Sequence, residues 1–335
     1  MHTSKKISVV ICTFNGEKYI TEQLDSILSQ TYPIYEIIIQ DDGSTDNTCH
    51  IIDHYCEKYP LIKLFKNKKN VGVNENFRTA FLRVTGDYVA PSDQDDIWLP
   101  HKIETMLNLI GKKMLCFSRS QVLYSDGTKG KFMLPFPLTY EQCILNGCLA
   151  GHTCLFHNSM LPYFKYKLLT ANNFPFDYVI SIVGFTLNSF VSTTEELQIW
   201  RRHPEALTKW VAKNEQFETL NTNAKRESKF GIFVFTVRNL LVGKRLSILK
   251  KHYETMWFLQ KKLNGEKHVI KLCFFLSNQS FLHYFLAGII IVRHRHKFFP
   301  TVKTTTLHQK LSLVSYSFRF PFKVWQEWSQ YEQQT

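Results

Sequence analysis

The chain lacks the long apolar run of a spanning helix and the glycine-rich patterns of two common nucleotide-binding classes. No apolar stretch among its 335 residues reaches the roughly 20 residues that a transmembrane helix needs. The closest, residues 285–292, is followed by the basic residues 293–297, so it could lie in a membrane interface but not cross it. Neither GxGxxG nor GxxxxGK[ST] occurs. A dinucleotide fold and a phosphate-loop ATPase are therefore disfavoured.

The sequence also shows no CxxC pattern and no pattern typical of a secretory signal peptide. The eight cysteines include no CxxC pair, and Cys12, Cys116 and Cys273 lie in or beside apolar stretches, as reduced and packed thiols do. The first residues do not resemble a secretory signal peptide. The expected location is the cytoplasm, with a peripheral position on the cytoplasmic face of the inner membrane as the alternative.

Acidic residues are few relative to basic ones. The chain has 41 Lys and Arg against 28 Asp and Glu, a formal net charge of +13. That balance favours an anionic partner: a sugar nucleotide, a lipid pyrophosphate, an anionic membrane face or a nucleic acid. Because no nucleic-acid-binding module is recognisable, nucleic acid is not an expected partner. The hydrophobic content of 44% excludes a disordered chain and permits a sizeable core.

Strand and helix patterns alternate through the first half of the chain. Short apolar runs predict strands at 7–12, 35–40, 61–65, 88–91 and 113–118, and helical spacing predicts helices at 17–30, 48–59 and 74–84. This succession is typical of an α/β fold with a mainly parallel central sheet. From about residue 213 the chain becomes basic and aromatic with long helical segments. We therefore predict a catalytic domain at 1–215 and a mostly helical C-terminal region at 216–335.

Two acidic clusters, 40–46 and 92–98, are the most informative feature that is present. Each follows an apolar run that reads as a buried strand, 37–39 before the first and 88–90 before the second. Open α/β sheets bind ligands at the carboxyl ends of their strands. The pattern therefore predicts a site for a nucleotide and a divalent cation.

Four segments in consistent order carry a resemblance to a known family: 8–15, 28–32, 41–46 and 93–98. They resemble the family 2 inverting glycosyltransferases, and most closely the rhamnosyltransferase-like enzymes of bacterial surface polysaccharides. The resemblance covers residues 5 to about 210. It implies the GT-A fold, a dTDP- or UDP-linked sugar donor and a divalent cation, Mg²⁺ or Mn²⁺. It also implies a glycan or lipid-linked oligosaccharide acceptor in capsule, O-antigen or exopolysaccharide synthesis.

The resemblance assigns the metal to the second acidic cluster. Asp95 is the implied ligand, Asp93 assists it or faces the ribose, and Asp96 is an alternative. A cation held by one or two carboxylates could neutralise the charge that develops on a diphosphate leaving group. The simpler reading is an acidic loop that caps the helix expected near Pro100.

The resemblance places the nucleotide at the first cluster. Asp42, with Asp41 beside it, is implied to bind the base, Thr13 and Asn15 to line the base and ribose pocket, and Asn76 to lie near the diphosphate. A carboxylate can accept the N3–H of a uracil or thymine ring. The alternative is an Asx-type turn and helix cap.

An inverting transfer also needs a base on the face of the sugar opposite the leaving group. Asp177, at the predicted start of an apolar helix, is the implied base, and a helix N-cap is the alternative. Relatives in this branch often read His-Asp-Trp-Trp where this chain has Phe-Asp-Tyr-Val, so the carboxylate is kept and its neighbours differ.

Three further residues complete the expected site. Arg202 and His203 resemble a segment that closes over the donor phosphates, and His152, in place of a cysteine, is expected with Asp96 on the acceptor side. Basic pairs among apolar residues in the C-terminal region are either solvated helix faces or a surface for anionic lipid. The runner-up function is a non-catalytic member that binds nucleotide sugar or scaffolds a membrane polysaccharide-assembly complex.

Overall fold

A computed structural model describes residues 4–131, 140–141, 149–171, 174–203, 247–278 and 280–298. The predicted domain boundary near residue 215, the basic pairs 225–226 and 244–245 and the aromatic stretch 316–325 lie outside these residues. The described residues fall into two compact units. The sheet unit contains 4–131, 149–171, 174–184 and 188–203, and the helical unit contains 140–141, 185–187, 247–278 and 280–298.

Strands and helices alternate in the first half of the sheet unit, as the sequence predicts. The elements up to the fourth strand are β1 (Ile7–Thr13), α1 (Ile20–Leu28), β2 (Glu36–Asp41), α2 (Thr48–Lys58), β3 (Ile62–Lys66), α3 (Val73–Phe81) and β4 (Tyr88–Ser92). The rest of the unit contains β5 (Ile97–Trp98), α4 (Lys102–Ile110), β6 (Leu115–Tyr124), β7 (Lys129–Lys131), η1 (Gly151–Thr153), β8 (Cys154–His157), η2 (Asn158–Lys165), α6 (Lys167–Ala171), α7 (Phe176–Thr186) and β9 (Phe190–Arg202).

The sheet has a parallel half and a mixed half. Its strand order is β3-β2-β1-β4-β8-β6-β9-β5, and β7 pairs with β6. The first four strands are parallel, while β8 runs antiparallel to both β4 and β6. The parallel half confirms the predicted fold class. The antiparallel extension is an addition that the sequence pattern did not reveal.

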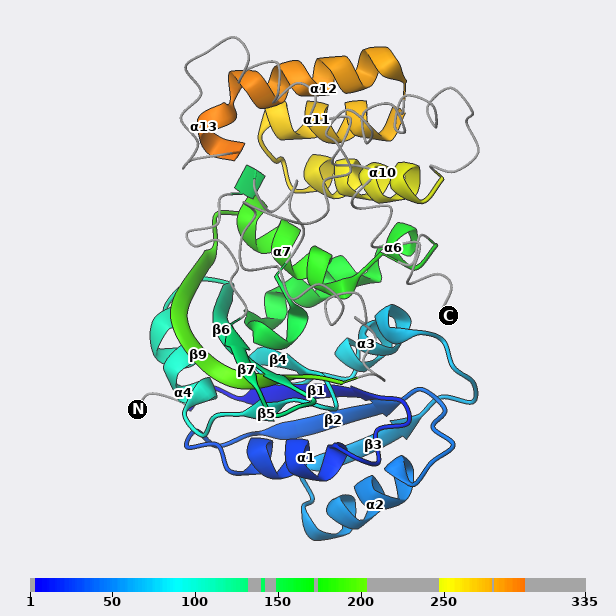
Figure 1. Cartoon of the computed structure of the whole chain (residues 1–335), viewed down its shortest axis with the longest axis vertical. Helices are drawn as coiled ribbons and strands as arrows, with labels where there is room; N and C mark the ends of the chain where they lie inside the picture. The colour runs from blue at the N-terminus through cyan, green and yellow to red at the C-terminus, as the bar shows by residue number, and fades with distance from the viewer. Residues whose placement is uncertain are drawn as a thin grey trace. The chain divides into compact units, whose positions relative to one another are not determined.

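Helices cover both faces of the parallel half. Helix α1 buries one apolar face, including Ile20, Leu24 and Ile27, and lies with α2 on one side of the sheet, whereas α3 lies on the other (Figure 1). The helical spacing predicts that this helix packs through Phe77, Phe81 and Leu82. Phe77 and Phe81 are buried, but Leu82, at the end of α3, is 56% exposed, so that part of the prediction is wrong. Because strands covered on both faces must be apolar throughout, β1 and β2 are buried along almost their whole length.

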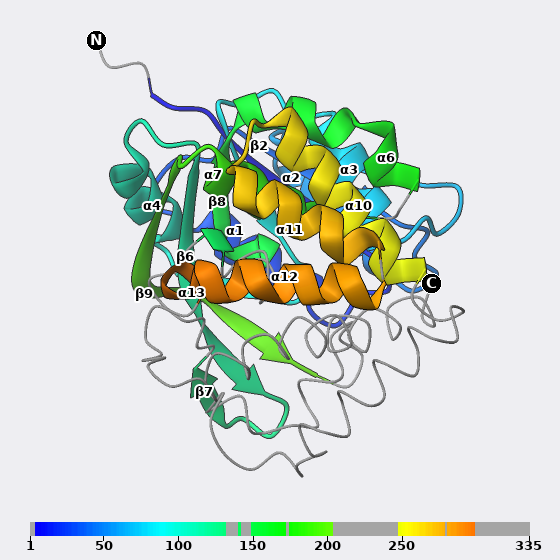
Figure 2. The same ribbon diagram turned by 90° about the horizontal axis from the view of Figure 1, so that it is seen from above.

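The helical unit is built from α10 (Ser247–Lys262), α11 (Lys267–Asn278), α12 (Phe281–Arg293) and α13 (Arg295–Phe298). Helices α10, α11 and α12 lie side by side (Figure 2). Their core includes Tyr253, Leu259, Leu272, Tyr284 and Ile291, all 0% exposed. Of the helices in the described ranges, none combines the length and apolar character needed to cross a bilayer.

Candidate active site at the carboxyl ends of the strands

Three parallel strands bring the two acidic clusters to one edge of the sheet. Strand β1 lies between β2 and β4, with Thr13 paired to Asp41 and Ile11 to Ser92. The residues that follow these strands therefore meet at the same edge, where open α/β sheets bind ligands. The loops at 40–46 and 92–98 therefore begin at neighbouring strand ends.

Asp41 holds the turn that follows β2. One carboxylate oxygen accepts from the backbone N–H groups of Gly43 (3.1 Å) and Ser44 (2.9 Å), and the other accepts from the Thr13 hydroxyl (2.9 Å). Asn15, with φ of 49°, accepts from the backbone N–H of Thr45 (2.9 Å). Asp41, Thr13 and Asn15 thus join the β1 and β2 loops, and the Asx-type turn that the sequence offered as an alternative is present.

Asp42 points to a different loop. Its oxygens accept from the backbone N–H groups of Val71 (2.8 Å) and Gly72 (2.9 Å) and from the Asn67 amide (2.8 Å). Asn67 also donates to the Asn76 side chain (2.9 Å), which itself donates to the backbone carbonyl at the end of β2. Asp42 and Asn76 are 3% and 2% exposed, so in this structure both residues hold the loop at 67–72 against the end of β2. Their nucleotide contacts stay predictions.

Gln94 fastens the second acidic cluster to the end of β1, a role that the sequence analysis missed. Its side-chain oxygen accepts from the Phe14 N–H (2.9 Å) and its NH₂ group donates to the Phe14 carbonyl (3.0 Å). A Cβ on Gly16 would collide with the Gln94 amide. A side chain at position 16 would therefore displace the Gln94 amide from Phe14.

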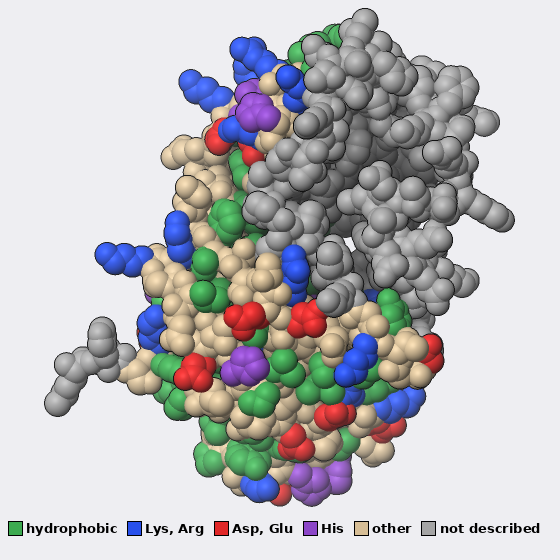
Figure 3. Space-filling model, turned by 60° about the vertical axis from the view of Figure 1, so that its left-hand side comes forward, with side chains coloured by type: hydrophobic (Ala, Val, Ile, Leu, Met, Phe, Trp, Pro, Cys, Tyr) green, Lys and Arg blue, Asp and Glu red, His purple; other side chains and the backbone are tan. Residues whose placement is uncertain are grey.

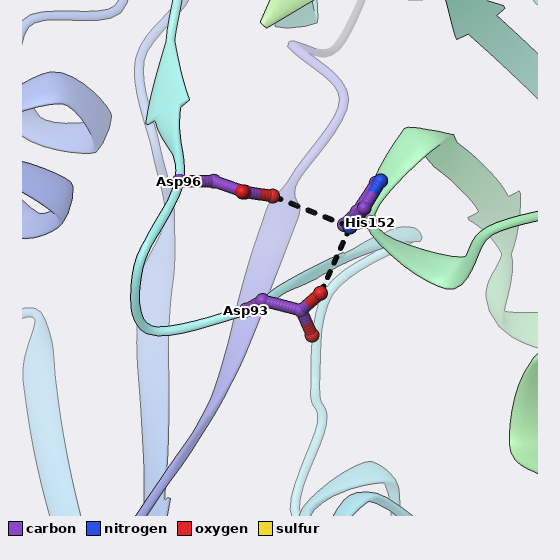
Figure 4. A group of neighbouring side chains, drawn as sticks. All are labelled: Asp93, Asp96 and His152. Carbon is purple, nitrogen blue, oxygen red and sulfur yellow. Dashed lines mark hydrogen bonds and ion pairs between the residues drawn. The ribbon is translucent and has the colours of Figure 1, made fainter. Parts of the chain in front are cut away.

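His152 brings Asp93 and Asp96 together (Figure 4). Its Nδ1 lies 2.8 Å from an Asp93 oxygen and 3.3 Å from an Asp96 oxygen. The His152 side chain is 4% exposed and that of Asp96 is 0% exposed, whereas Asp93 is 42% exposed. Because an ionised carboxylate only accepts, we assign the proton of the His152 ring to Nδ1. No partner for Nε2 lies among the described residues.

The buried side chain of Lys102 stabilises the group formed by Asp93, Asp96 and His152. The Lys102 ammonium donates to the His152 backbone carbonyl (2.8 Å) and to the Gln198 side chain, whose NH₂ faces Asp96 (3.4 Å). Burial raises the pKa of Asp96 to about 7 and lowers the pKa of Lys102 to about 7. Burial also lowers the pKa of His152, but the charges of Asp96 and Asp93 raise it, and the net direction is upward. No sequence pattern pointed to Lys102 or Gln198.

Asp95 pairs with a residue more than a hundred positions away. Its carboxylate lies 2.8 Å from Nε2 of His203, whose ring lies 4.5 Å from the Tyr19 ring. Neighbouring Arg202 ends β9, is 3% exposed and stacks its guanidinium 4.4 Å over the Trp200 ring. The predicted donor-phosphate segment thus contacts the second acidic cluster directly.

Asp177 lies in the first turn of α7, next to the segment that carries His152. A Cβ placed on Gly151 would lie 3.5 Å from Cβ of Asp177, and the Asp177 charge contributes to the raised pKa of the buried Cys154 thiol. The side chain is half-buried and accepts from the Tyr178 N–H (2.9 Å). Stacking of Phe176 on Phe77, 4.0 Å between ring centroids, fixes this end of α7 against α3.

The environment of Cys12 shows that the two acidic clusters are neighbours. Burial raises the pKa of its thiol, and the charges of Asp93 and Asp42 raise it further. Both carboxylates therefore lie within electrostatic reach of one sulfur atom near the end of β1. On the other side of Asp93, the segment 151–152 joins two acids, since His152 bonds to Asp93 and Gly151 lies beside Asp177.

Two groups of side chains in the described part of the chain have ligand atoms close enough to share a cation. They are Asp93, Asp96 and His152 at the sheet edge, and Glu141, Glu266 and His268 in the helical unit. In the second group, Lys297 already pairs with both glutamates, at 3.3 and 2.9 Å. Only the first group adjoins a further acid, Asp95, that is 17% exposed. The sheet edge is therefore the better cation site.

These features define an α/β protein with the GT-A fold. A family model described as glycosyl transferase family 2 matches residues 8–178, and the chain belongs to this family. The fold is also that of S. aureus TarS 1–349 in complex with UDP-GlcNAc, with a TM-score of 0.50 and 16% identity over 96% of this chain and 91% of that one.

Three curated relatives each match part of this chain. Rv1520 of Mycobacterium tuberculosis, an uncharacterized protein, is 29% identical over 212 residues, which is 60% of each chain. WfgD of Escherichia coli, a UDP-Glc:α-D-GlcNAc-diphosphoundecaprenol β-1,3-glucosyltransferase, is 30% identical over 43% of this chain and 58% of its own. TuaG of Bacillus subtilis, a putative teichuronic acid biosynthesis glycosyltransferase, is 34% identical over 43% and 60%. The chain thus spans about 60% of the length of these relatives.

Proposed function

We propose that this protein transfers a sugar, with inversion, from a nucleotide-diphosphate donor to a hydroxyl of a glycan or lipid-linked oligosaccharide in bacterial surface-polysaccharide synthesis. The observation that carries the proposal is the succession of contacts at the sheet edge from Asp93 to His152, whose neighbour Gly151 lies beside Asp177. Family membership supports glycosyl transfer, and the geometry supports the assignment of roles within the site.

A divalent cation would be held by Asp95 and Asp93. Both are carboxylates, the ligand type that Mg²⁺ and Mn²⁺ prefer, and both are more exposed than Asp96. Bound there, the cation would neutralise negative charge on the donor diphosphate. His203 pairs with Asp95 of this loop, and Arg202 precedes it at the end of β9. A cationic group there would favour departure of the diphosphate leaving group.

Asp177 is the proposed general base. Its carboxylate would accept the proton of the acceptor hydroxyl while that oxygen attacks the anomeric carbon and the bond to the diphosphate oxygen breaks. The nucleoside diphosphate then leaves with the electron pair of the broken bond. This role needs a carboxylate that solvent or acceptor can reach, and Asp177 is half-buried beside Gly151.

The donor and acceptor classes follow from the relatives. The name of WfgD specifies UDP-glucose and a diphosphoundecaprenol-linked acceptor, and the TarS structure holds UDP-GlcNAc. These support a UDP-linked hexose or N-acetylhexosamine, while the branch suggested by the sequence motifs supports dTDP-rhamnose. The proposal therefore includes both hexosyl and rhamnosyl transfer.

A donor panel tests the proposal. The full chain is incubated with Mn²⁺ and a set of UDP-, dTDP- and GDP-linked sugars, with a membrane extract as acceptor source, and nucleoside diphosphate release is measured. We expect release from one or two donors that EDTA abolishes. Binding of a donor without release under any condition would instead favour the non-catalytic, scaffolding alternative.

A further inference from the structure

Helix α12 exposes apolar side chains along one side. Leu282, Phe285 and Ile289 are 62%, 44% and 44% exposed, and their i, i+3, i+7 spacing places them on one face. We call these three residues the α12 stripe. On the other side of the helix, Tyr284, Ala287 and Ile291 are 0% exposed. A helix that is apolar on both sides belongs where both sides are covered.

A second surface, of aromatic and basic side chains, runs across α10 and α11 to His283 of α12. Trp257 of α10 lies 5.9 Å from Phe274 of α11, which is 40% exposed and lies 6.2 Å from His283 of α12. Lys261 lies over the Trp257 ring at 4.8 Å. Aromatic rings with lysine side chains laid along them suit a boundary between apolar and aqueous surroundings.

A groove opens on α10 within this surface. It has a volume of ≈ 340 Å³ and is lined by Trp257, Phe258, Lys261 and Lys262. The apolar floor and the two ammonium groups match a molecule with an acyl chain and an anionic head group. Such a groove is complementary to an acidic phospholipid at the edge of a bilayer.

The charge of the chain is divided unequally along its length. Residues 1–203 carry twenty Lys and Arg against twenty Asp and Glu, whereas residues 204–335 carry 21 against eight. The entire net charge of +13 therefore belongs to the part of the sequence that contains α10–α13. Lys, Arg and His side chains gather on the surface around the end of α12 and α13 (Figure 3). Anionic lipid attracts such a segment by about 1 kcal/mol per basic residue near the surface.

We propose that the α12 stripe and the aromatic-basic surface of α10 and α11 dock this protein onto an anionic bilayer, with α12 lying in the plane of the interface. The 13 residues of α12 span about 20 Å, too short to cross a bilayer but long enough to bury one face in it. A second copy of the chain is a poorer partner, since its helical region would bring the same positive charge to the same surface. The proposal does not depend on the transfer reaction.

Vesicle flotation of the full chain, without donor or acceptor, tests the docking. We expect binding to vesicles with 30% phosphatidylglycerol and at least tenfold weaker binding to pure phosphatidylcholine. The double variant Phe285→Ser/Ile289→Ser should lose at least tenfold in binding, and Lys261→Gln/Lys262→Gln should lose about 25-fold, or about fivefold per lysine. The lysine variant should also show a shallower salt dependence.

Matched variants separate docking from misfolding. Leu82→Ser and Leu109→Ser alter side chains of the sheet unit that are 56% and 41% exposed, and vesicle binding should be unchanged. Leu282→Ser alone, at the most exposed stripe position, provides a second test if the double variant unfolds. The proposal is overturned if wild-type protein does not float, if both stripe variants float as wild type does, or if they change only the sedimentation coefficient, which would mark the stripe as a contact between copies.

Discussion

The sheet unit and the helical unit use charge in opposite ways. Every aspartate of the chain lies at or before residue 177, and in the sheet unit the acids at the strand ends are buried or paired by specific partners, such as Asp41 by its turn and Asp95 by His203. In the helical unit, nine Lys and Arg stand against two glutamates over residues 247–298. Acidic side chains held by specific partners at one place indicate a binding or catalytic site. Basic side chains spread over a region indicate attraction to an extended anionic surface.

The largest expected effect is a loss of transfer activity caused by one change in the sheet unit. Asp177→Asn removes the proposed base while it keeps the size and the helix position of the side chain, so the rate of transfer should fall by about 10³-fold. Donor affinity, measured by calorimetry with Mn²⁺, should stay within about twofold. Asp53→Asn, an exposed change on α2, is the matched control. Transfer at the wild-type rate in Asp177→Asn would remove the base assignment.

A somewhat smaller effect is expected at the proposed cation site. Asp95→Ala should weaken Mn²⁺-dependent donor binding by about 100-fold, because a carboxylate ligand and the partner of His203 are lost together. Binding of the same variant to anionic vesicles should be unchanged, which sharpens the contrast between the two units. Equal donor affinity in the wild type and Asp95→Ala would contradict the role of this carboxylate.

His152 should orient Asp93, and loss of this contact should lower the Mn²⁺ affinity about tenfold. Outer partners that orient a ligand are worth about 10–100-fold in metal affinity or activity. His152→Asn keeps a donor at the position of Nδ1 and should retain most of the Mn²⁺ affinity, whereas His152→Gln moves the donor and should lose it. If both variants lose Mn²⁺ affinity equally and completely, His152 binds the cation itself.

The last expected effect, the smallest near neutral pH, concerns the stability of the helical unit in acid. Burial lowers the pKa of His252 to about 3, so below about pH 6.5 the unfolded chain takes up a proton that the folded unit excludes. Above about pH 6.5 the buried imidazole does not affect the pH dependence of stability. Below that pH the free energy of unfolding falls, by up to about 1.4 kcal/mol per pH unit. His252→Phe should flatten this dependence between pH 7.5 and 5.

Hydrogen exchange of peptides from 247–278, followed by mass spectrometry, measures that difference. His54→Gln, a change on α2 where the side chain is 64% exposed, should leave the acid dependence as it is in the wild type. Identical pH profiles for wild type and His252→Phe would show that the buried imidazole does not set the acid limit.

The parallel half of the fold could be predicted because each strand there is covered on both faces. Continuous apolar runs such as 37–39 are then the only composition that fits, and the intervening helices show their buried faces at helical spacing. Of the mixed half, β6 was predicted as a strand at 113–118, whereas β8 has four residues and β5 has two, too short for a pattern. Helix α7 was predicted at Asp177, where the apolar run is long.

Within the site, the sequence indicated which segments meet but not which atoms. The sequence does not distinguish the adjacent residues Asp41 and Asp42. Because successive side chains point to opposite sides, Asp41 holds the loop after β1 and Asp42 holds the loop at 67–72. Lys102 and Gln198 lie 96 positions apart, and no local pattern could pair them. Their contact follows only from the packing of α4 against β9.

A crystal structure with Mn²⁺ and a bound nucleotide-diphosphate sugar tests the central assignment most directly, through the anomalous signal of the metal. The account predicts a manganese peak within coordination distance of Asp95 or Asp93, with the sugar between it and Asp177. A peak at Glu141, Glu266 and His268 instead, with no density for the donor at the sheet edge, would contradict it.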